Sequence, residues 1–308
     1  MSDMLLPLAA LVAFYPAQQE THPDLAGLLS RVSEEAEVLQ QNAPKVLTQE
    51  TLEQRAALPP SRFRPRLGKA VADVPKPRLQ VREVVSEYSV GTLKESRSHD
   101  LLEFRQVVSV DGRPVQSVES ARHALTLGLH SPDDRIRKRM LEDFARYGLV
   151  DVASDYALIL LAFSKRGLQE LEIQPAGEDR VGADDAVVLA WRQTSEAKGE
   201  LEFMGRKVAR RALQGRLWTR RSDGLPLRIR AWAEHPEGKR QIRDEATVEY
   251  TQSPHGFLTP VSVVHRHFID GQVVTENLYR YEPFKLFAAD AEIKFTEIPD
   301  PPPPPTKK

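Results

Sequence analysis

The sequence contains no cysteine among its 308 residues. This excludes disulfides, thiolate metal ligands and thiol nucleophiles. It also lacks the G-x-S-x-G nucleophile turn, the P-loop and the G-x-G-x-x-G dinucleotide motif. Formal net charge is -1, so no overall field favours nucleic acid or an anionic membrane. These absences favour a folded protein that is not an enzyme and needs no cofactor.

No apolar run is long enough to cross a bilayer of roughly 30 Å, the longest being residues 4–17. Polar Gln18, Gln19 and Glu20 follow this run, as they follow the apolar core of a secretory signal. No basic residue precedes it, and Asp3 stands where a positive charge is usual. We expect residues 1–20 to be a signal-like segment of a periplasmic or secreted protein. The alternative is an apolar element that docks on the domain of a cytoplasmic protein.

Helical patterns are confined to the first half of the chain. Apolar residues recur at helical spacing over 25–39, and further helices are predicted at 118–129 and 131–148, which form a two-helix insertion at 117–147. The stretch 55–78 is basic and rich in proline. Because no aromatic ladder accompanies its charges, it is predicted to be a solvated loop rather than a nucleic-acid arm.

Strand patterns dominate from residue 79 onwards. Turn signals stand at Asp111-Gly112, Ser222-Asp223-Gly224 and Asp270-Gly271. The run 156–163 is almost wholly apolar and predicts a strand buried on both faces. The other predicted strands are 79–90, 101–110, 168–173, 181–194, 213–220, 225–234, 243–251, 257–269 and 273–287.

This order of elements predicts a mainly β protein with some α-helix (α+β). We expect one domain over 21–298, built on a large curved antiparallel sheet, an open half-barrel with helices on its concave face. The last ten residues, 299–308, are rich in proline and are predicted to be an extended, disordered tail.

One hairpin carries a family resemblance. Gly215-Arg216-Leu217-Trp218-Thr219 is followed, across the turn, by Asp223-Gly224-Leu225-Pro226-Leu227-Arg228-Ile229. The pair resembles the "G-x-(aliphatic)-W … (D)G-x-P-x-R" hairpin of the LolA/LolB-like periplasmic lipoprotein carrier superfamily. The wider run from residue 260 to 295 is similar to exported proteins of an acidobacterial type that are often assigned there. The resemblance covers residues 24–298 and implies an open half-barrel whose helices cover the concave side.

The resemblance also implies an apolar cavity that shelters acyl chains. An exported envelope protein of this kind would bind an apolar ligand or a lipidated protein, as outer-membrane lipoprotein-sorting proteins do. Strand alternation and the helical stripe give the candidate lining residues: Leu217, Leu227, Ile229, Ala231, Val248, Tyr250, Val261, Val263, Ile136, Met140 and Phe144. The alternative is an interaction module in which these side chains fill the cavity themselves and no ligand enters.

Two further patterns suggest weaker hypotheses. His265 and His267 share one strand face, a spacing that can bind a metal, but no third ligand is evident and no metal site is predicted. Trp218 and Trp232 alternate with Arg228 and Arg230. This pattern is typical of a sheet face on which arginine stems cover indole rings.

Overall fold

The computed structural model describes residues 24–59, 77–92, 101–130, 142–152, 155–194, 200–204 and 207–287. The predicted signal-like segment, the proline-rich tail, most of the basic loop and the candidates Ile136 and Met140 lie outside these residues. Within the described part, no helix is both long and apolar enough to cross a membrane.

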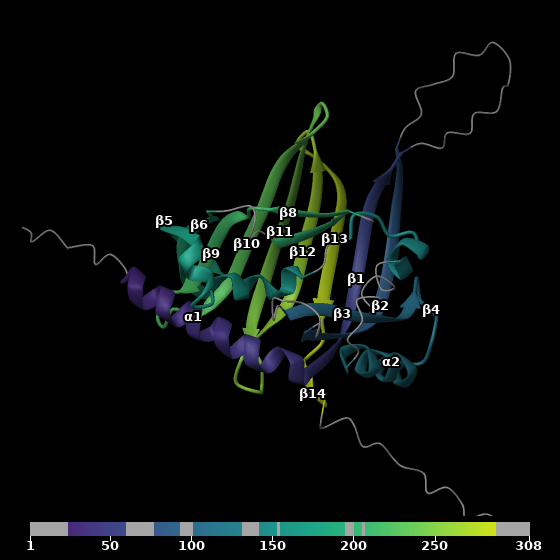
Figure 1. Cartoon of the computed structure of the whole chain (residues 1–308), viewed down its shortest axis with the longest axis horizontal. Coiled ribbons are helices and arrows are strands. Elements are labelled where there is room, and N and C mark those ends of the chain that lie inside the picture. The colour runs from purple at the N-terminus through teal and green to yellow at the C-terminus, as the bar shows by residue number, and fades with distance from the viewer. Residues whose placement is uncertain are drawn as a thin grey trace, which may run out of the picture.

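The fold is a large antiparallel sheet that is not closed, as predicted (Figure 1). The twelve-stranded sheet has the order β4-β3-β2-β1-β13-β12-β11-β10-β9-β6-β5, with β14 paired to β1, and its two ends do not meet. The strands are β1 (Val46–Leu58), β2 (Arg78–Thr92), β3 (Leu101–Val110), β4 (Arg113–Pro114), β5 (Leu171–Val181), β6 (Asp184–Gln193), β9 (Gln214–Arg220), β10 (Pro226–Glu237), β11 (Arg240–Gln252), β12 (Leu258–Ile269), β13 (Gln272–Tyr281) and β14 (Lys285–Leu286). Strands β7 (Glu200–Met204) and β8 (Lys207–Arg211) form a separate pair.

Few helices accompany the sheet. They are α1 (Leu25–Asn42), α2 (Val118–His130) and the 3₁₀ segments η1 (Ala43–Lys45), η2 (Tyr156–Phe163) and η3 (Gly167–Glu170). The predicted helices at 25–39 and 118–129 are therefore confirmed. Of the third predicted helix, residues 142–146 are described and helical, and Gly148 ends this segment with φ +79°. Figure 1 shows α1 running across the lower end of the sheet.

We call the sheet face under α1 and η2 the inner face. The helix α2 packs on the opposite face, where Leu125 contacts Leu102 and Phe104. One apolar row crosses it at matched register: Leu52, Tyr279, Val263, Val248, Ile229, Leu217 and Leu189. Each of these side chains is at most 2% exposed. Val32, Ala36 and Leu39 of α1 pack into the same core as this row. Burial of this continuous layer is the main force that holds the helices on the sheet.

The segment 156–163 is not the strand that its apolar run predicted. It is η2, a 3₁₀ helix on the inner face, with Ile159, Leu160 and Phe163 at most 1% exposed. An apolar run without periodicity marks burial on all sides but does not distinguish a strand from a buried helical segment. The next predicted strand, 168–173, begins instead with η3, and β5 starts at Leu171.

Both ends of the predicted basic loop, 55–78, belong to strands in the structure. Residues 55–58 belong to β1, which alternates buried and more exposed positions, and Arg78 already begins β2. Several buried positions of β1 are polar, so its alternation of buried and exposed side chains cannot be recognised from the apolar residues alone. Glu50 and Gln54, for example, are at most 1% exposed.

Glycine is required at one position of the hairpin that carries the resemblance. A Cβ atom on Gly215 would lie 2.0 Å from the carbonyl oxygen of Arg230 and 2.7 Å from the indole of Trp191. The hairpin turns form as predicted: Asp270 and Gly271 have φ of 51° and 78°, and Asp111 and Gly112 have φ of 48° and 73°. Positive φ at both central residues matches the twist of the flanking strands.

Candidate apolar-ligand site

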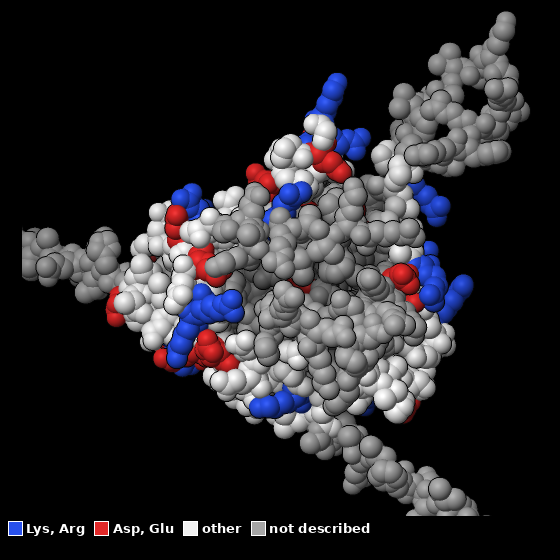
Figure 2. Space-filling model, viewed as in Figure 1, with Lys and Arg blue, Asp and Glu red and all other residues white. Residues whose placement is uncertain are grey.

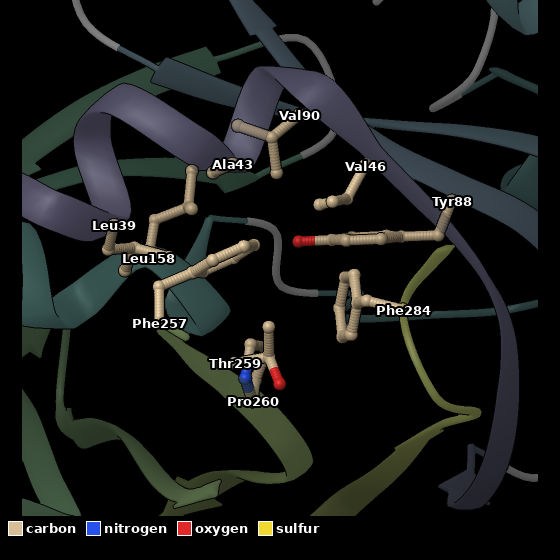
Figure 3. Close-up of a pocket in the computed structure, with 10 residues that line it drawn as sticks. All are labelled: Leu39, Ala43, Val46, Tyr88, Val90, Leu158, Phe257, Thr259, Pro260 and Phe284. Atoms are coloured by element: carbon tan, nitrogen blue, oxygen red, sulfur yellow. The ribbon is translucent and has the colours of Figure 1, made fainter. Parts of the chain in front are cut away.

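A pocket opens at the lower end of the inner face, where chain segments from across the sequence meet (Figure 3). Leu39 and Ala43 come from the end of α1 and from η1, Val46 from β1, and Leu158 from η2. The remaining lining residues are Tyr88, Val90, Phe257, Thr259, Pro260 and Phe284. Apart from the hydroxyls of Tyr88 and Thr259, these side chains are apolar. The site therefore favours hydrocarbon over a charged group.

The pocket is nearly closed in this structure. The volume open to the centre of a water-sized sphere is ≈ 10 Å³. This is about the space that one water molecule needs. The pocket is therefore too small in this structure to hold an alkyl chain unless lining side chains move.

The segment η2 fills the space above the sheet next to the pocket. Leu158 lines the pocket, and Leu160 lies deeper in the same core. The hydroxyl of Tyr250 accepts a hydrogen bond from Leu160 N at 3.3 Å and donates one to the carbonyl oxygen of Ala157 at 3.3 Å. Burial raises the pKa of Tyr250, so this phenol stays protonated and keeps both bonds. Tyr250 thus anchors η2, the segment next to the pocket.

Tyr88 is the most polar residue of the lining. Its ring is fixed by Tyr281, at 5.0 Å between centroids, and by Phe284, at 6.2 Å. Its side chain is 1% exposed, and its hydroxyl has no hydrogen-bond partner among the residues that the structure describes. Burial, reinforced by the carboxylate of Glu103, raises the pKa of Tyr88 well above its ordinary value. The hydroxyl is therefore a permanent donor.

An ion network lies behind the Tyr88 ring. The Arg105 guanidinium donates to both carboxylate oxygens of Glu50, at 2.6 and 2.7 Å, and lies 2.8 Å from Glu103. It also lies over the rings of Tyr88 and Tyr279, 5.0 and 5.4 Å from their centroids. Glu103 in turn accepts hydrogen bonds from the backbone N–H groups of residues 155 and 157, just before and within η2. The network therefore ties β1 and β3 to the start of η2.

The two histidines singled out in the sequence do face the same side of β12. His267 Nδ1 lies 2.7 Å from Asp244 Oδ1, and His265 Nε2 lies 3.3 Å from the same oxygen. His265 also contacts Asn277 at 3.1 Å and stacks on Tyr156. Among the residues that the structure describes, no group of three or more His, Cys, Asp or Glu side chains is arranged to hold a metal ion. The pair therefore serves to connect β11, β12, β13 and η2.

Most of the predicted lining residues lie in the inner-face core but do not line the pocket. These are Leu217, Ile229, Ala231, Val248, Tyr250, Val263 and Phe144. Two others lie elsewhere because β-bulges shift the alternation. Leu227 packs with Trp218 on the opposite, outer face, and Val261 is 42% exposed. Neither belongs to the inner-face core.

The pocket residues themselves were not predicted from the sequence. Alternation in β2 places Val84, Ser86, Tyr88 and Val90 on one face, and this signal could have identified Tyr88 and Val90. The contributions of Phe257 and Phe284 depend on turns that bring the ends of β12 and β13 to α1. No local pattern indicates that meeting.

The outer face has the predicted arginine and tryptophan arrangement. Arg228 lies over Trp218 at 5.7 Å, and Arg243 lies over Trp232 at 4.9 Å. Arg228 also pairs with Glu249 at 2.6 Å. Figure 2 shows the opposite side of the molecule, the side of α1, where acidic and basic side chains intermingle on the described part of the surface.

The fold has solved structural neighbours. A DUF1329 family protein from Desulfovibrio piger matches over 87% of this chain and 94% of its own, with 10% identity and a TM-score of 0.35. A LolA superfamily protein from Nitrosomonas europaea matches over 82% and 93%, with 13% identity and a TM-score of 0.27. A putative outer membrane lipoprotein-sorting protein domain from Vibrio parahaemolyticus matches over 85% and 95%, with 10% identity and a TM-score of 0.30.

The structural neighbours thus include the LolA superfamily that the hairpin resembles. No family model matches the sequence, and no curated protein matches it either. At these identities and TM-scores the neighbours establish neither a ligand nor an activity for this chain. Its resemblance to proteins of an acidobacterial type stays a prediction.

Proposed function

We propose that this protein binds the acyl chain of a lipid or of a lipidated protein, which enters at the pocket and extends between the inner face and η2. The observation that carries the proposal is the continuity of apolar surface. Leu39 and Leu158 line the pocket and also belong to the inner-face core, so hydrocarbon leads from the pocket into the layer under η2.

The energetics favour such binding without any catalytic group. Each methylene moved from water into this layer contributes about 0.8 kcal/mol. The segment that has to yield is η2, and 3₁₀ helices have poorer hydrogen-bond geometry than α-helices. Its two hydrogen bonds with Tyr250 are long, at 3.3 Å each. We therefore propose that η2 moves to make room beyond its start, which Glu103 holds through the N–H groups of residues 155 and 157. The proposed activity is binding rather than catalysis.

We place this activity in the bacterial envelope, in the periplasm or outside the cell. The support is the apolar segment 4–17 with its polar flank, which resembles an export signal. A protein that shelters an acyl chain is also most useful where such chains must cross an aqueous compartment.

One observation favours a second function, an interaction module with a self-filled core. Leu158, Ile159, Leu160 and Phe163 of η2 already occupy the inner face, at 7% exposure or less. If η2 never moves, this core is complete, and partners would bind on the outside of the protein.

A blocking substitution separates the two functions. Ala43 lines the pocket and is 3% exposed, so Ala43→Leu should obstruct the entry point. Ala186, at 1% exposure in the outer-face cluster with Trp218, offers a matched control in Ala186→Leu. We expect a fluorescent fatty-acyl probe to bind the wild-type protein and the control, and to bind Ala43→Leu at least tenfold more weakly. Absence of probe binding to the wild type would favour the interaction module.

A further inference from the structure

The Tyr88 hydroxyl is a polar atom without a described partner at the centre of an apolar pocket. Figure 3 shows the end of the side chain pointing between Val46 and Phe284 toward Phe257. Contacts of the ring with Tyr281 and Phe284 prevent it from turning away. A buried donor left without an acceptor is destabilising, so the pocket is better suited to a ligand that brings an acceptor than to plain hydrocarbon.

Charge around the pocket distinguishes between possible acceptors. Behind Tyr88, the cation of Arg105 is matched against the two carboxylates of Glu50 and Glu103. Arg105 has one nitrogen, Nη1, without a described partner, but the residue does not line the pocket. A free carboxylate in the pocket would therefore lose its hydration with no cation in the lining to pair with it. A neutral carbonyl oxygen would accept the hydrogen bond without this penalty.

We propose that Tyr88 recognises the carbonyl group of an acyl ester or amide, with its Oη donating a hydrogen bond to the carbonyl oxygen while the alkyl chain continues toward Leu158 and the inner-face core. This inference rests on the proposed function and narrows it. The ligand class becomes chains joined through a neutral acyl linkage, as in glycerolipids and acylated proteins, rather than free fatty acids. Thr259, the other hydroxyl in the lining, lies beside Pro260 at the base of the view in Figure 3.

The test compares ligands that differ only in the carbonyl group. Glycerol monopalmitate carries it, and the ether 1-O-hexadecylglycerol does not. Each is used to displace a fluorescent alkyl probe from the full chain. The expected result is that the ester binds about fivefold more tightly than the ether, the factor that one hydrogen bond provides. An N-palmitoyl peptide then shows whether an amide-linked chain on a protein binds as well as the lipid ester.

The isosteric variant Tyr88→Phe assigns the effect to the hydroxyl. In this variant the ester and the ether should bind with nearly equal affinity. The melting temperature of the ligand-free protein should not fall, since the substitution removes a donor that has no described partner. Tyr279→Phe is the matched control. Its ring also contacts Arg105 but does not line the pocket, so the ester preference should persist.

Three results would overturn the inference. If ester and ether bind the wild type equally, no carbonyl is recognised, although acyl binding itself would stand. If Tyr88→Phe keeps the preference, the hydroxyl is satisfied by water and plays no part. If palmitate binds more tightly than its glycerol ester, an anion is preferred and Arg105 becomes the recognising group. Failure of every ligand to bind would instead refute the proposed function.

Discussion

Replacing Arg105 with methionine tests whether the buried ion network holds the fold together. The guanidinium is 2% exposed and pairs with Glu50 and Glu103, which are each 1% exposed. Methionine keeps the length of the side chain but leaves two carboxylates buried without their cation. Breaking a buried pair by removing one partner destabilises a protein by about 3–5 kcal/mol. We expect a loss of this size in the free energy of unfolding, measured by urea denaturation.

Two comparisons make this prediction sharp. Arg192 forms a pair with Glu172 that is 66% and 56% exposed, so Arg192→Met should change stability by about 1 kcal/mol or less. Combining Arg105→Met with Glu50→Gln removes one of the two stranded charges and should recover part of the loss. The reasoning is refuted if Arg105→Met and Arg192→Met destabilise equally, or if the combined variant is less stable than Arg105→Met alone.

Four further substitutions test the packing, the register and the outer-face charges. Gly215→Ala should destabilise by about 1–3 kcal/mol in urea, because its methyl group would collide with Trp191. Leu217→Ala should cost about 2–5 kcal/mol, whereas Val261→Ala should stay within about 0.5 kcal/mol, since only Leu217 lies in the core. Burial alone would raise the pKa of Glu245, but hydrogen bonds from Arg230 and Arg243 lower it below the ordinary value of 4.5. Glu245 should therefore contribute stability above pH 4.5 that is lost as the pH falls. The melting temperature of Glu245→Gln should therefore fall less steeply than that of the wild type as the pH is lowered from about 6 to about 3, the range in which carboxyl groups titrate.

Each of these has a contrary outcome. An undiminished stability of Gly215→Ala would mean that the β9–β10 hairpin can relax away from the tryptophan. Equal losses for Leu217→Ala and Val261→Ala would contradict the bulge in β12. If the melting temperatures of Glu245→Gln and the wild type fall equally steeply in acid, the ion pairs of Glu245 with Arg230 and Arg243 do not contribute to stability.

The strands were predictable wherever turn chemistry and apolar alternation coincided. Asp270-Gly271 fixes the β12–β13 hairpin because both residues adopt positive φ. The turn residues Ser222-Asp223-Gly224 located the hairpin after Trp218, where Gly224 has φ of 73°. Alternation then assigned Ile229, Val248 and Val263 to one face, as the register confirms.

Alternation failed where the register shifts. Leu227 and Val261 each stand at a bulge, and one extra residue turns the side chain to the other face of the sheet. A bulge leaves no mark in the apolar pattern of its own strand. It can be inferred only from the partner strand, which the sequence does not identify.

Polar residues that are buried through distant partners were also beyond sequence reasoning. Gln54 is fully buried because Asn277 and the backbone of residue 150 satisfy its amide. Glu50 is buried because Arg105 lies opposite, 55 positions along the chain. Each looks like a solvated residue when its own segment is considered alone, so the pattern of β1 does not identify it as a strand with one buried face.

The central claim is that an acyl chain occupies the inner face when η2 yields. The most direct measurement is a native mass spectrum of the protein purified without detergent from its own host, before and after extraction with organic solvent. We predict an added mass that extraction removes and that fragments as an acyl ester or amide. A spectrum showing only the bare chain, from protein that also fails to take up glycerol monopalmitate in solution, would contradict the account.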